Sequence, residues 1–302
     1  MRYAVVGTGA IGGYYGGMLA NADADVHFLF HSDYDAAWSN GLRVNSVNGD
    51  FEIEHINAYN STASMPKADV VLVGLKTLQN RLLPELLDPI VKEGTLIALI
   101  QNGIGYEQEL QEEFPEARIC GGLAFICAEK TAPAVVSHYD YGKLTLALLG
   151  DEPCDAFDAM VADMEDAGIN VVRADDLNTA RWKKLVWNTG FNGQSVLFGK
   201  NTEELLFGRE KEMYVKPAML EIIKAARANG ADVDESFADE MIEMTLNMKP
   251  YYPSMHVDYS HGRRLEVEAI YSRPLRLGLA KGVEMPVMEE MEKRLKEIKN
   301  RC

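Results

Sequence analysis

Three glycines near the start of the chain have the spacing Gly-x-Gly-x-x-Gly. The six residues of this motif are Gly7, Thr8, Gly9, Ala10, Ile11 and Gly12. The first glycine allows a turn too tight for a Cβ atom, the second lets the backbone approach a pyrophosphate, and the third lets a helix pack against a strand. The N–H groups and dipole at the helix N-terminus favour phosphate. An apolar run precedes the motif and a small-residue segment follows it, which is the context of a dinucleotide-binding turn.

In the second half of the chain, three polar residues recur at four-residue intervals. They are Lys184, Asn188 and Asn192, in a segment that we expect to be helical. Four-residue spacing puts the three side chains on one helical face. One interpretation is a solvated helix face, which suits lysine and asparagine. The other is a polar binding stripe, because the apolar residues between them should bury part of the helix.

A second polar segment follows later in the chain. Taken alone, Ser254 could be a helix N-cap, Asp258 an acid on a helix surface and Glu266 a solvated carboxylate. His256 and His261 lack the i,i+4 spacing of a metal pair, so we interpret both as surface residues. The sequence implies no metal site.

The first half of the chain alternates apolar runs with helical segments. We expect helices at 10–21 and 153–167, a short helix started by the capping-box spacing of Ser32 and Asp35, a hairpin-like insertion at 41–56, and strands at 2–6, 26–30, 68–73, 95–100, 119–126, 134–141, 143–149 and 170–173. The continuous apolar runs are typical of parallel strands covered on both faces.

Polar residues follow two of these strands. Lys76 comes after the strand at 68–73, and Asn102 comes after the strand at 95–100. In open α/β sheets the ligand lies outside the carboxyl ends of the strands, so both residues belong to the candidate site.

Composition changes near residue 175, after which almost every segment has helical periodicity. We therefore predict an α/β protein with two domains. The dinucleotide-binding domain should span 1–174, and an all-helical domain should span 175–302.

The charge balance limits the partners of the chain. With 46 acidic and 30 basic residues, the net charge is -16, which should repel nucleic acid and anionic membrane surfaces. The four cysteines have no Cys-x-x-Cys pairing and should be reduced, structural thiols. The first expected strand starts at residue 2, and we find no long apolar run, so we expect a cytoplasmic protein.

Five separated motifs occur in a family-specific order. They are Gly7-x-Gly9-Ala10-x-Gly12, Leu75-Lys76, Gln101-Asn102-Gly103-x-Gly105, Trp182-x-Lys184-Leu185-x-x-Asn188-x-x-x-Asn192, and Ser254-Met255-x-x-Asp258 with Glu266. In these motifs the chain resembles the ketopantoate reductases (2-dehydropantoate 2-reductases) over essentially its whole length. The resemblance implies an N-terminal Rossmann domain, a C-terminal helical domain, and reduction of a 2-keto acid by NADPH in the cleft between them.

The resemblance also implies catalytic roles for two residues. Lys184 resembles the family's catalytic lysine, whose ammonium can stabilise the alkoxide formed from a ketone and supply the proton. Glu266 resembles the family's glutamate, which would accept hydrogen bonds from substrate hydroxyls and influence the lysine.

Other positions correspond to binding residues of the family. Asn188 and Asn192 resemble the carboxamides that hold the substrate, and Ser254 resembles the hydroxyl that binds its carboxylate. Asn102 resembles the residue beside the nicotinamide and the substrate, and Lys76 a cation on the cofactor side.

Two features depart from the family's pattern. Where the family often places an arginine that meets the 2′-phosphate of NADP, this chain has His31 and Ser32. No acid closes that strand to select NAD, because Asp33 falls in the expected first helical turn, so we predict NADP, with His31 among its ligands. After Asn192 the family commonly continues Pro-Leu-Thr, whereas here Gly193-Gln194-Ser195 follows.

Three functions are therefore considered. The first is reduction of ketopantoate in the pathway to pantothenate and coenzyme A. The second is reduction of a different 2-keto acid on the same scaffold, which the segment after Asn192 permits. The third is an NADP-binding sensor without turnover, because a fold alone does not prove chemistry. A homodimer is a hypothesis for the assembly.

Overall fold

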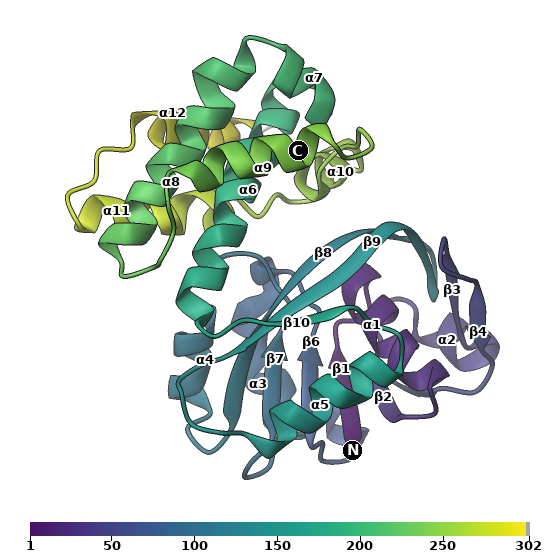
Figure 1. Ribbon diagram of the computed structural model, residues 1–302. Helices are drawn as coiled ribbons and strands as arrows, with labels where there is room; N and C mark the ends of the chain where they lie inside the picture. The colour runs from purple at the N-terminus through teal and green to yellow at the C-terminus, as the bar shows by residue number, and fades with distance from the viewer. Residues whose placement is uncertain (300–302) are drawn as a thin grey trace. The chain divides into compact units, whose positions relative to one another are not determined.

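The computed structural model describes residues 1–299, which form two compact units (Figure 1). The first unit consists of Met1–Gln101 and Gly105–Leu177. The second consists of Asn102–Ile104 and the described chain from Asn178 onward. The short segment Asn102–Ile104 thus groups with the helical unit although it follows a strand of the first. Cys302, which we expect to be a reduced thiol, lies outside the described residues.

In the described residues, ten strands form one mixed sheet in the first unit. The strands are β1 (Arg2–Val6), β2 (Asp25–Leu29), β3 (Leu42–Ser46), β4 (Phe51–Ile53), β5 (Asn57–Tyr59), β6 (Val70–Val73), β7 (Leu96–Leu99), β8 (Arg118–Ala132), β9 (Val135–Leu148) and β10 (Val171–Arg173). Their order is β4-β3-β9-β8-β7-β6-β1-β2-β5, and β10 pairs with β9. The neighbours from β8 through β5 are parallel, as expected of a dinucleotide-binding sheet.

Helices cover both faces of this sheet. They are α1 (Ala10–Asn21), α2 (Tyr34–Asn40), α3 (Leu83–Leu87), α4 (Tyr106–Glu113) and α5 (Asp155–Asp166), with 3₁₀ turns η1 (Thr62–Ser64) and η2 (Thr77–Leu82). Successive side chains of a strand point to opposite faces, so β1 contributes to two cores. Tyr3 and Val5 pack with residues of α1 and α5, whereas Ala4 and Val6 pack with residues of α3 and α4. The sheet is therefore buried on both sides.

Three expectations about local structure are corrected. The segments 134–141 and 143–149 form one strand, β9, which pairs with the equally long β8 through several irregularities. The short strand β5 at the sheet edge was not expected. Helix α2 has Asp33 at its N-cap, and no side chain of the described residues caps it, so the capping box from Ser32 is wrong.

The second unit is helical. Its helices are α6 (Leu177–Phe198, from Asn178 onward), α7 (Thr202–Phe207), α8 (Lys216–Ala228), α9 (Ser236–Leu246), α10 (Ser254–Ser260), α11 (Arg273–Ala280) and α12 (Pro286–Lys299), with π-helical turns η3 (Lys211–Val215) and η4 (Glu268–Ser272). Trp182, Phe191, Ile222 and Met288 are fully buried and form part of its core. Within residues 1–299, no helix combines the length and apolar character needed to span a membrane.

Candidate active site

The glycine turn between β1 and α1 is packed so closely that side chains are excluded. Gly7 has φ +98°, and a Cβ atom there would lie 2.6 Å from the backbone nitrogen of Leu75. A Cβ atom on Gly12 would lie 2.3 Å from the carbonyl oxygen of Gly7. At Gly9, by contrast, no described atom beyond Gly9 and its two chain neighbours lies within 4 Å of the Cβ position. Two glycines therefore allow the turn to close, and the middle one leaves open space in front of the helix.

A fourth glycine, which the sequence analysis missed, completes this packing. Gly74 follows β6, and a Cβ atom there would lie 2.8 Å from both the Gly12 nitrogen and the Gly7 oxygen. Its position directly before the Leu75-Lys76 motif could have indicated its importance. Gly74 and Leu75 pack against the glycine turn, and the half-buried Lys76 is the next residue in the sequence. This packing places Lys76 near the turn.

The turn fits the pyrophosphate of a dinucleotide. Helix α1 starts after Gly9, no side chain of residues 1–299 caps it, and its first turn contains no acid. The N–H groups of that turn lack intrahelical acceptors and carry the positive end of the helix dipole. The open space at Gly9 lies at the same place. The residues present are therefore suited to hold the phosphates of a nicotinamide cofactor.

The end of β2 carries the expected cofactor residue His31 and a buried acid. His31 and Ser32 are exposed, whereas Asp33 is only 5 % exposed. Burial acts to raise the pKa of Asp33, but hydrogen bonds from Lys130, Ser32 and the Ala134 N–H outweigh it and hold the pKa below its usual value. Asp33 is therefore an ionised carboxylate whose hydrogen bonds come from the protein. It precedes α2 instead of lying in its first turn.

In the second unit, a chain of side-chain hydrogen bonds joins five of the expected site residues. Asn102 Nδ2 donates to Glu266 Oε2 at 3.3 Å, and Asn188 Nδ2 donates to Asn102 Oδ1 at 3.3 Å. Asn192 Nδ2 donates to Asn188 Oδ1 at 3.2 Å, and Ser254 Oγ donates to Asn192 Oδ1 at 3.3 Å. In this series of hydrogen bonds, every donor is directed at the next residue on the way to the carboxylate of Glu266.

The backbone fixes the direction of this chain. The N–H of Met255, in the first turn of α10, donates to Asn192 Oδ1 at 3.1 Å. That oxygen must therefore face α10, which turns the amide nitrogen of Asn192 toward Asn188. At the other end, Arg273 Nη1 donates to the carbonyl oxygen of Ile104 at 3.3 Å and ties the segment that carries Asn102 to the helical unit.

Burial decides between the alternatives that the sequence left open. Asn188 is 2 % exposed and Asn192 1 % exposed, so these two do not form a solvated helix face. Asp258 and Glu266 are also buried, and the interpretations of a surface acid and a solvated carboxylate are wrong. Arg263 Nη1 lies 3.4 Å from Asp258 Oδ1, which compensates the buried charge.

The neighbouring lysines of α6 point to different aromatic rings. Lys184 is half-buried, and its Nζ lies 5.9 Å from the centre of a Trp187 ring. Lys183 is exposed, and its Nζ lies 5.7 Å from the ring centre of Phe237. One residue of an α-helix turns by about 100°, which accounts for the divergence. Lys184 lies one turn before Asn188, at the start of the buried polar stripe.

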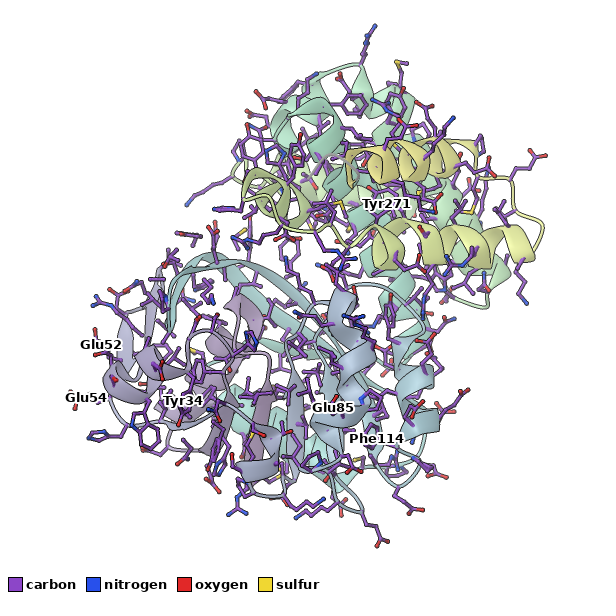
Figure 2. All side chains as sticks on the ribbon, turned by 180° about the vertical axis from the view of Figure 1, so that it is seen from behind. Tyr34, Glu52, Glu54, Glu85, Phe114 and Tyr271 are labelled. Atoms are coloured by element: carbon purple, nitrogen blue, oxygen red, sulfur yellow. The ribbon has the colours of Figure 1, made fainter. Side chains whose placement is uncertain are left out.

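The unusual segment after Asn192 is explained by packing against Tyr271. A Cβ atom on Gly193 would lie 2.4 Å from the Tyr271 hydroxyl oxygen, which accepts a hydrogen bond from the Gly193 N–H at 2.7 Å. The same hydroxyl is placed to donate to Gln194 Oε1 or to Thr189 O, each at 3.1 Å. Tyr271 is labelled among the helices of the second unit in Figure 2. Burial raises its pKa well above the usual value, so the hydroxyl keeps its proton.

The two histidines near α10 differ. His261 is exposed, which confirms the expectation of a surface residue. His256 is half-buried, so the same expectation is wrong for it. Its Nδ1 lies 3.0 Å from the carbonyl oxygen of Ser195, and its ring stacks on Tyr252 with centroids 4.2 Å apart. His256 therefore helps to hold α10 against the end of α6.

Comparisons with known proteins agree on one family. The family models described as ketopantoate reductase PanE/ApbA and its C-terminal domain match residues 3–150 and 176–299. A 2-dehydropantoate 2-reductase from a Nostoc species is 43% identical over 98% of this chain and 94% of its own length. The crystal structure of 2-dehydropantoate 2-reductase from Geobacter metallireducens has a TM-score of 0.94 and 38% identity, and covers 98% of this chain and 99% of that chain.

A more distant neighbour shows how widely this fold is used. A ternary structure of D-mandelate dehydrogenase with NADH and anilino(oxo)acetate has a TM-score of 0.89 at 20% identity, covering 100% of this chain and 99% of that chain. At that identity the likeness concerns the fold alone.

Together these matches define the class. The chain belongs to the ketopantoate reductase family. It is an oxidoreductase of the kind that uses a nicotinamide cofactor.

Proposed function

We propose that this chain reduces 2-dehydropantoate to pantoate with NADPH, the step that leads toward pantothenate and coenzyme A. The observation that carries the proposal is the directed chain of hydrogen bonds that ends on Glu266, with Lys184 one helical turn from Asn188. The 43% identity to the Nostoc enzyme, whose name states this reaction, supports the choice of substrate.

In this proposal the nicotinamide, when bound, supplies the hydride that adds to the keto carbon. Lys184 donates a proton from Nζ to the keto oxygen, so the carbonyl becomes a hydroxyl and the cofactor is oxidised. Its positive charge stabilises the developing alkoxide before the proton is transferred. Glu266, held by the amide of Asn102, accepts hydrogen bonds from substrate hydroxyls.

The remaining polar groups bind and orient the substrate. The Ser254 hydroxyl and the N-terminal turn of α10 suit the substrate carboxylate. Asn188 and Asn192 are buried and hydrogen-bonded to each other, to Asn102 and to Ser254, so they act mainly by fixing Asn102 and Ser254. Asn102 also lies beside the nicotinamide in this proposal. Lys76 and the glycine turn bind the cofactor.

The preference for NADP is part of the proposal. An NAD site usually has an acid near the end of the second strand that binds the ribose hydroxyls. Here the nearest acid, Asp33, is buried and engaged by protein donors, and the exposed residues at that strand end are His31 and Ser32.

A different 2-keto acid is the second candidate, and one observation now weakens its basis. Gly193-Gln194-Ser195 was the reason to consider it, yet Gln194 and Ser195 are fully buried. They pack with Tyr271 and His256, which accounts for their identity without reference to the substrate.

NADPH oxidation measured across a panel of 2-keto acids tests the proposal. The panel includes 2-dehydropantoate, pyruvate and benzoylformate, the last because a mandelate dehydrogenase shares the fold. We expect the highest kcat/KM with 2-dehydropantoate. A higher value with another acid supports the second candidate, and tight NADPH binding without turnover of any acid supports the sensor.

We also propose a homodimer, because one structural neighbour, the ketopantoate reductase from Staphylococcus aureus, is dimeric. Light scattering coupled to size-exclusion chromatography should give twice the chain mass of 33.6 kDa.

A further inference from the structure

Lys130, far from the glycine motif in the sequence, contacts Asp33 in the segment that follows β2. It belongs to β8, near the tip of the β8–β9 hairpin, and β9 pairs in parallel with β3. Figure 1 shows the two long strands of this hairpin side by side. Lys130 Nζ lies 2.7 Å from Asp33 Oδ2, and the backbone N–H of Ala134 donates to the same oxygen at 3.2 Å. The hairpin tip is therefore attached to the residue that precedes α2, whose first residue, Tyr34, is labelled in Figure 2.

The end of β2 is itself bound to the glycine turn. Thr8 Oγ1 donates to the carbonyl oxygen of Leu29 at 2.9 Å. Residues 30–33 therefore leave the sheet beside the turn that fits the pyrophosphate. In dinucleotide-binding folds this strand end faces the adenosine ribose and any 2′-phosphate on it. The tip of the β8–β9 hairpin is held at that place.

The two partners of the ion pair differ in exposure. Only 7 % of the Asp33 side chain is exposed, and its other oxygen, Oδ1, accepts a hydrogen bond from Ser32 Oγ at 2.9 Å. The Lys130 side chain is 37 % exposed. An ammonium has three N–H donors, and one of them is directed at Asp33. The exposed partner of this pair is therefore the lysine, and Asp33, which holds it, follows His31 by two residues.

We propose that Lys130, held in position by Asp33, recognises the 2′-phosphate of NADPH together with His31. This inference rests on the proposed function for the identity of the cofactor. A chain with a net charge of -16 needs a local cation to attract a phosphate dianion. Asp33 is a positioning residue that fixes the lysine, and its negative charge limits the discrimination against NADH.

Binding of the two reduced cofactors, measured by fluorescence titration, tests this role directly. Lys130→Met keeps the length of the side chain and removes its charge. We expect NADPH to bind about 10- to 100-fold more weakly to this variant, which corresponds to the loss of one hydrogen bond to a charged group. The affinity for NADH should change by less than about twofold. Lys143→Met is the matched control, because Lys143 is an exposed lysine of the same hairpin whose Nζ lies 5.9 Å from the Phe125 ring centre.

Two further measurements sharpen the test. Lys130→Arg should keep the preference for NADPH, since it keeps the charge. Competition by 2′,5′-ADP against NADPH should weaken in Lys130→Met, whereas competition by 5′-AMP should not. Retained NADH binding shows that the Lys130→Met variant is folded.

Three results would overturn the inference. They are equal binding of NADH and NADPH by the unaltered chain, equal loss of both cofactors in Lys130→Met, and the same loss in Lys143→Met. All of these readouts are binding constants and need no substrate. Failure to reduce 2-dehydropantoate with cofactor discrimination intact would reject the proposed function and leave the role of Lys130 standing.

Discussion

The glycine turn of the first unit and the polar chain of the second are built in opposite ways. The turn requires residues without a side chain, because there is no room for a Cβ atom at Gly7, Gly12 or Gly74. The polar chain depends on side chains that are present, and each amide from Asn192 to Asn102 must point in one direction. The first region presents backbone N–H groups and the second presents side-chain donors and acceptors.

This difference implies different sensitivities. A site made of backbone should fail when volume is added, whereas a site made of side chains should fail when a charge or a donor is removed. Buried polar networks are costly when one partner is lost, because the remaining groups stay desolvated and unsatisfied. Substitutions in the two units should therefore separate cofactor binding from turnover.

The largest effect is expected in the second unit, for Lys184→Ala. Loss of a general acid typically lowers the rate about 10²- to 10⁴-fold, so turnover should fall by that factor. NADPH affinity should persist, because the proposed phosphate site lies in the first unit. Steady-state kinetics and cofactor titration on the same variant measure both quantities.

Lys183→Ala is the internal control. Lys183 is exposed and directed at Phe237, so its removal should leave turnover within about twofold and cost roughly 0.5–1 kcal/mol of stability at most. If Lys183→Ala were the damaging change, the assignment of the acid would be wrong.

The next effect belongs to the first unit and compares two glycines. A Cβ atom on Gly9 meets no described atom within 4 Å beyond its own chain neighbours, so Gly9→Ala should leave the melting temperature nearly unchanged. It should still weaken cofactor binding, by about 1–3 kcal/mol, if the pyrophosphate occupies that space. Gly12→Ala should lower the melting temperature itself, because its Cβ atom would lie 2.3 Å from the Gly7 oxygen. Differential scanning fluorimetry with and without NADPH distinguishes the two outcomes.

The sequence predicted elements where local pattern dominates. The expected helix 10–21 coincides with α1, and most strands of the first half appear within two residues of their expected bounds. The strand expected at 119–126 is an exception, because β8 continues to Ala132. The sequence predicts a strand boundary at Gly142, but β9 passes through this residue, because the pairing with β8 accommodates the irregularity. The three-residue β5 has too little pattern of its own and exists because β2 offers a free edge for pairing.

The candidate site was predictable to a similar extent. Four-residue spacing placed Lys184, Asn188 and Asn192 on one face, but spacing cannot indicate which partners accept their hydrogen bonds. Gly74 and Lys130 were missed because their importance comes from contacts with residues far away in the sequence. Gly74 packs on the glycine turn, and Lys130 reaches Asp33 from the tip of a hairpin.

A smaller effect is expected for Tyr271→Phe, which tests why the segment after Asn192 is unusual. The change removes the buried hydroxyl that accepts from the Gly193 N–H and is placed to donate to Gln194 Oε1, which should cost about 1–3 kcal/mol in the free energy of unfolding. Urea unfolding measures this loss. We expect KM for the keto acid to change little, because Tyr271 supports α6 from inside the unit. A substrate preference that changes with Tyr271→Phe would instead link this segment to specificity.

The smallest effect concerns the pH dependence of the first unit. The pKa of Asp33 is lowered in the folded chain, so its hydrogen bonds stabilise the fold at pH values above the unfolded pKa of about 3.9, and this contribution disappears as the pH falls through the folded value. In Asp33→Asn the group cannot ionise. Between about pH 6 and pH 3, the unaltered chain should therefore lose more stability than the variant. All other carboxylates titrate in both chains, so the difference isolates Asp33. If both chains lost stability equally with falling pH, the charge of Asp33 would not stabilise the contact between the hairpin tip and the segment before α2. That contact would then depend on the hydrogen bond from the Ala134 N–H alone.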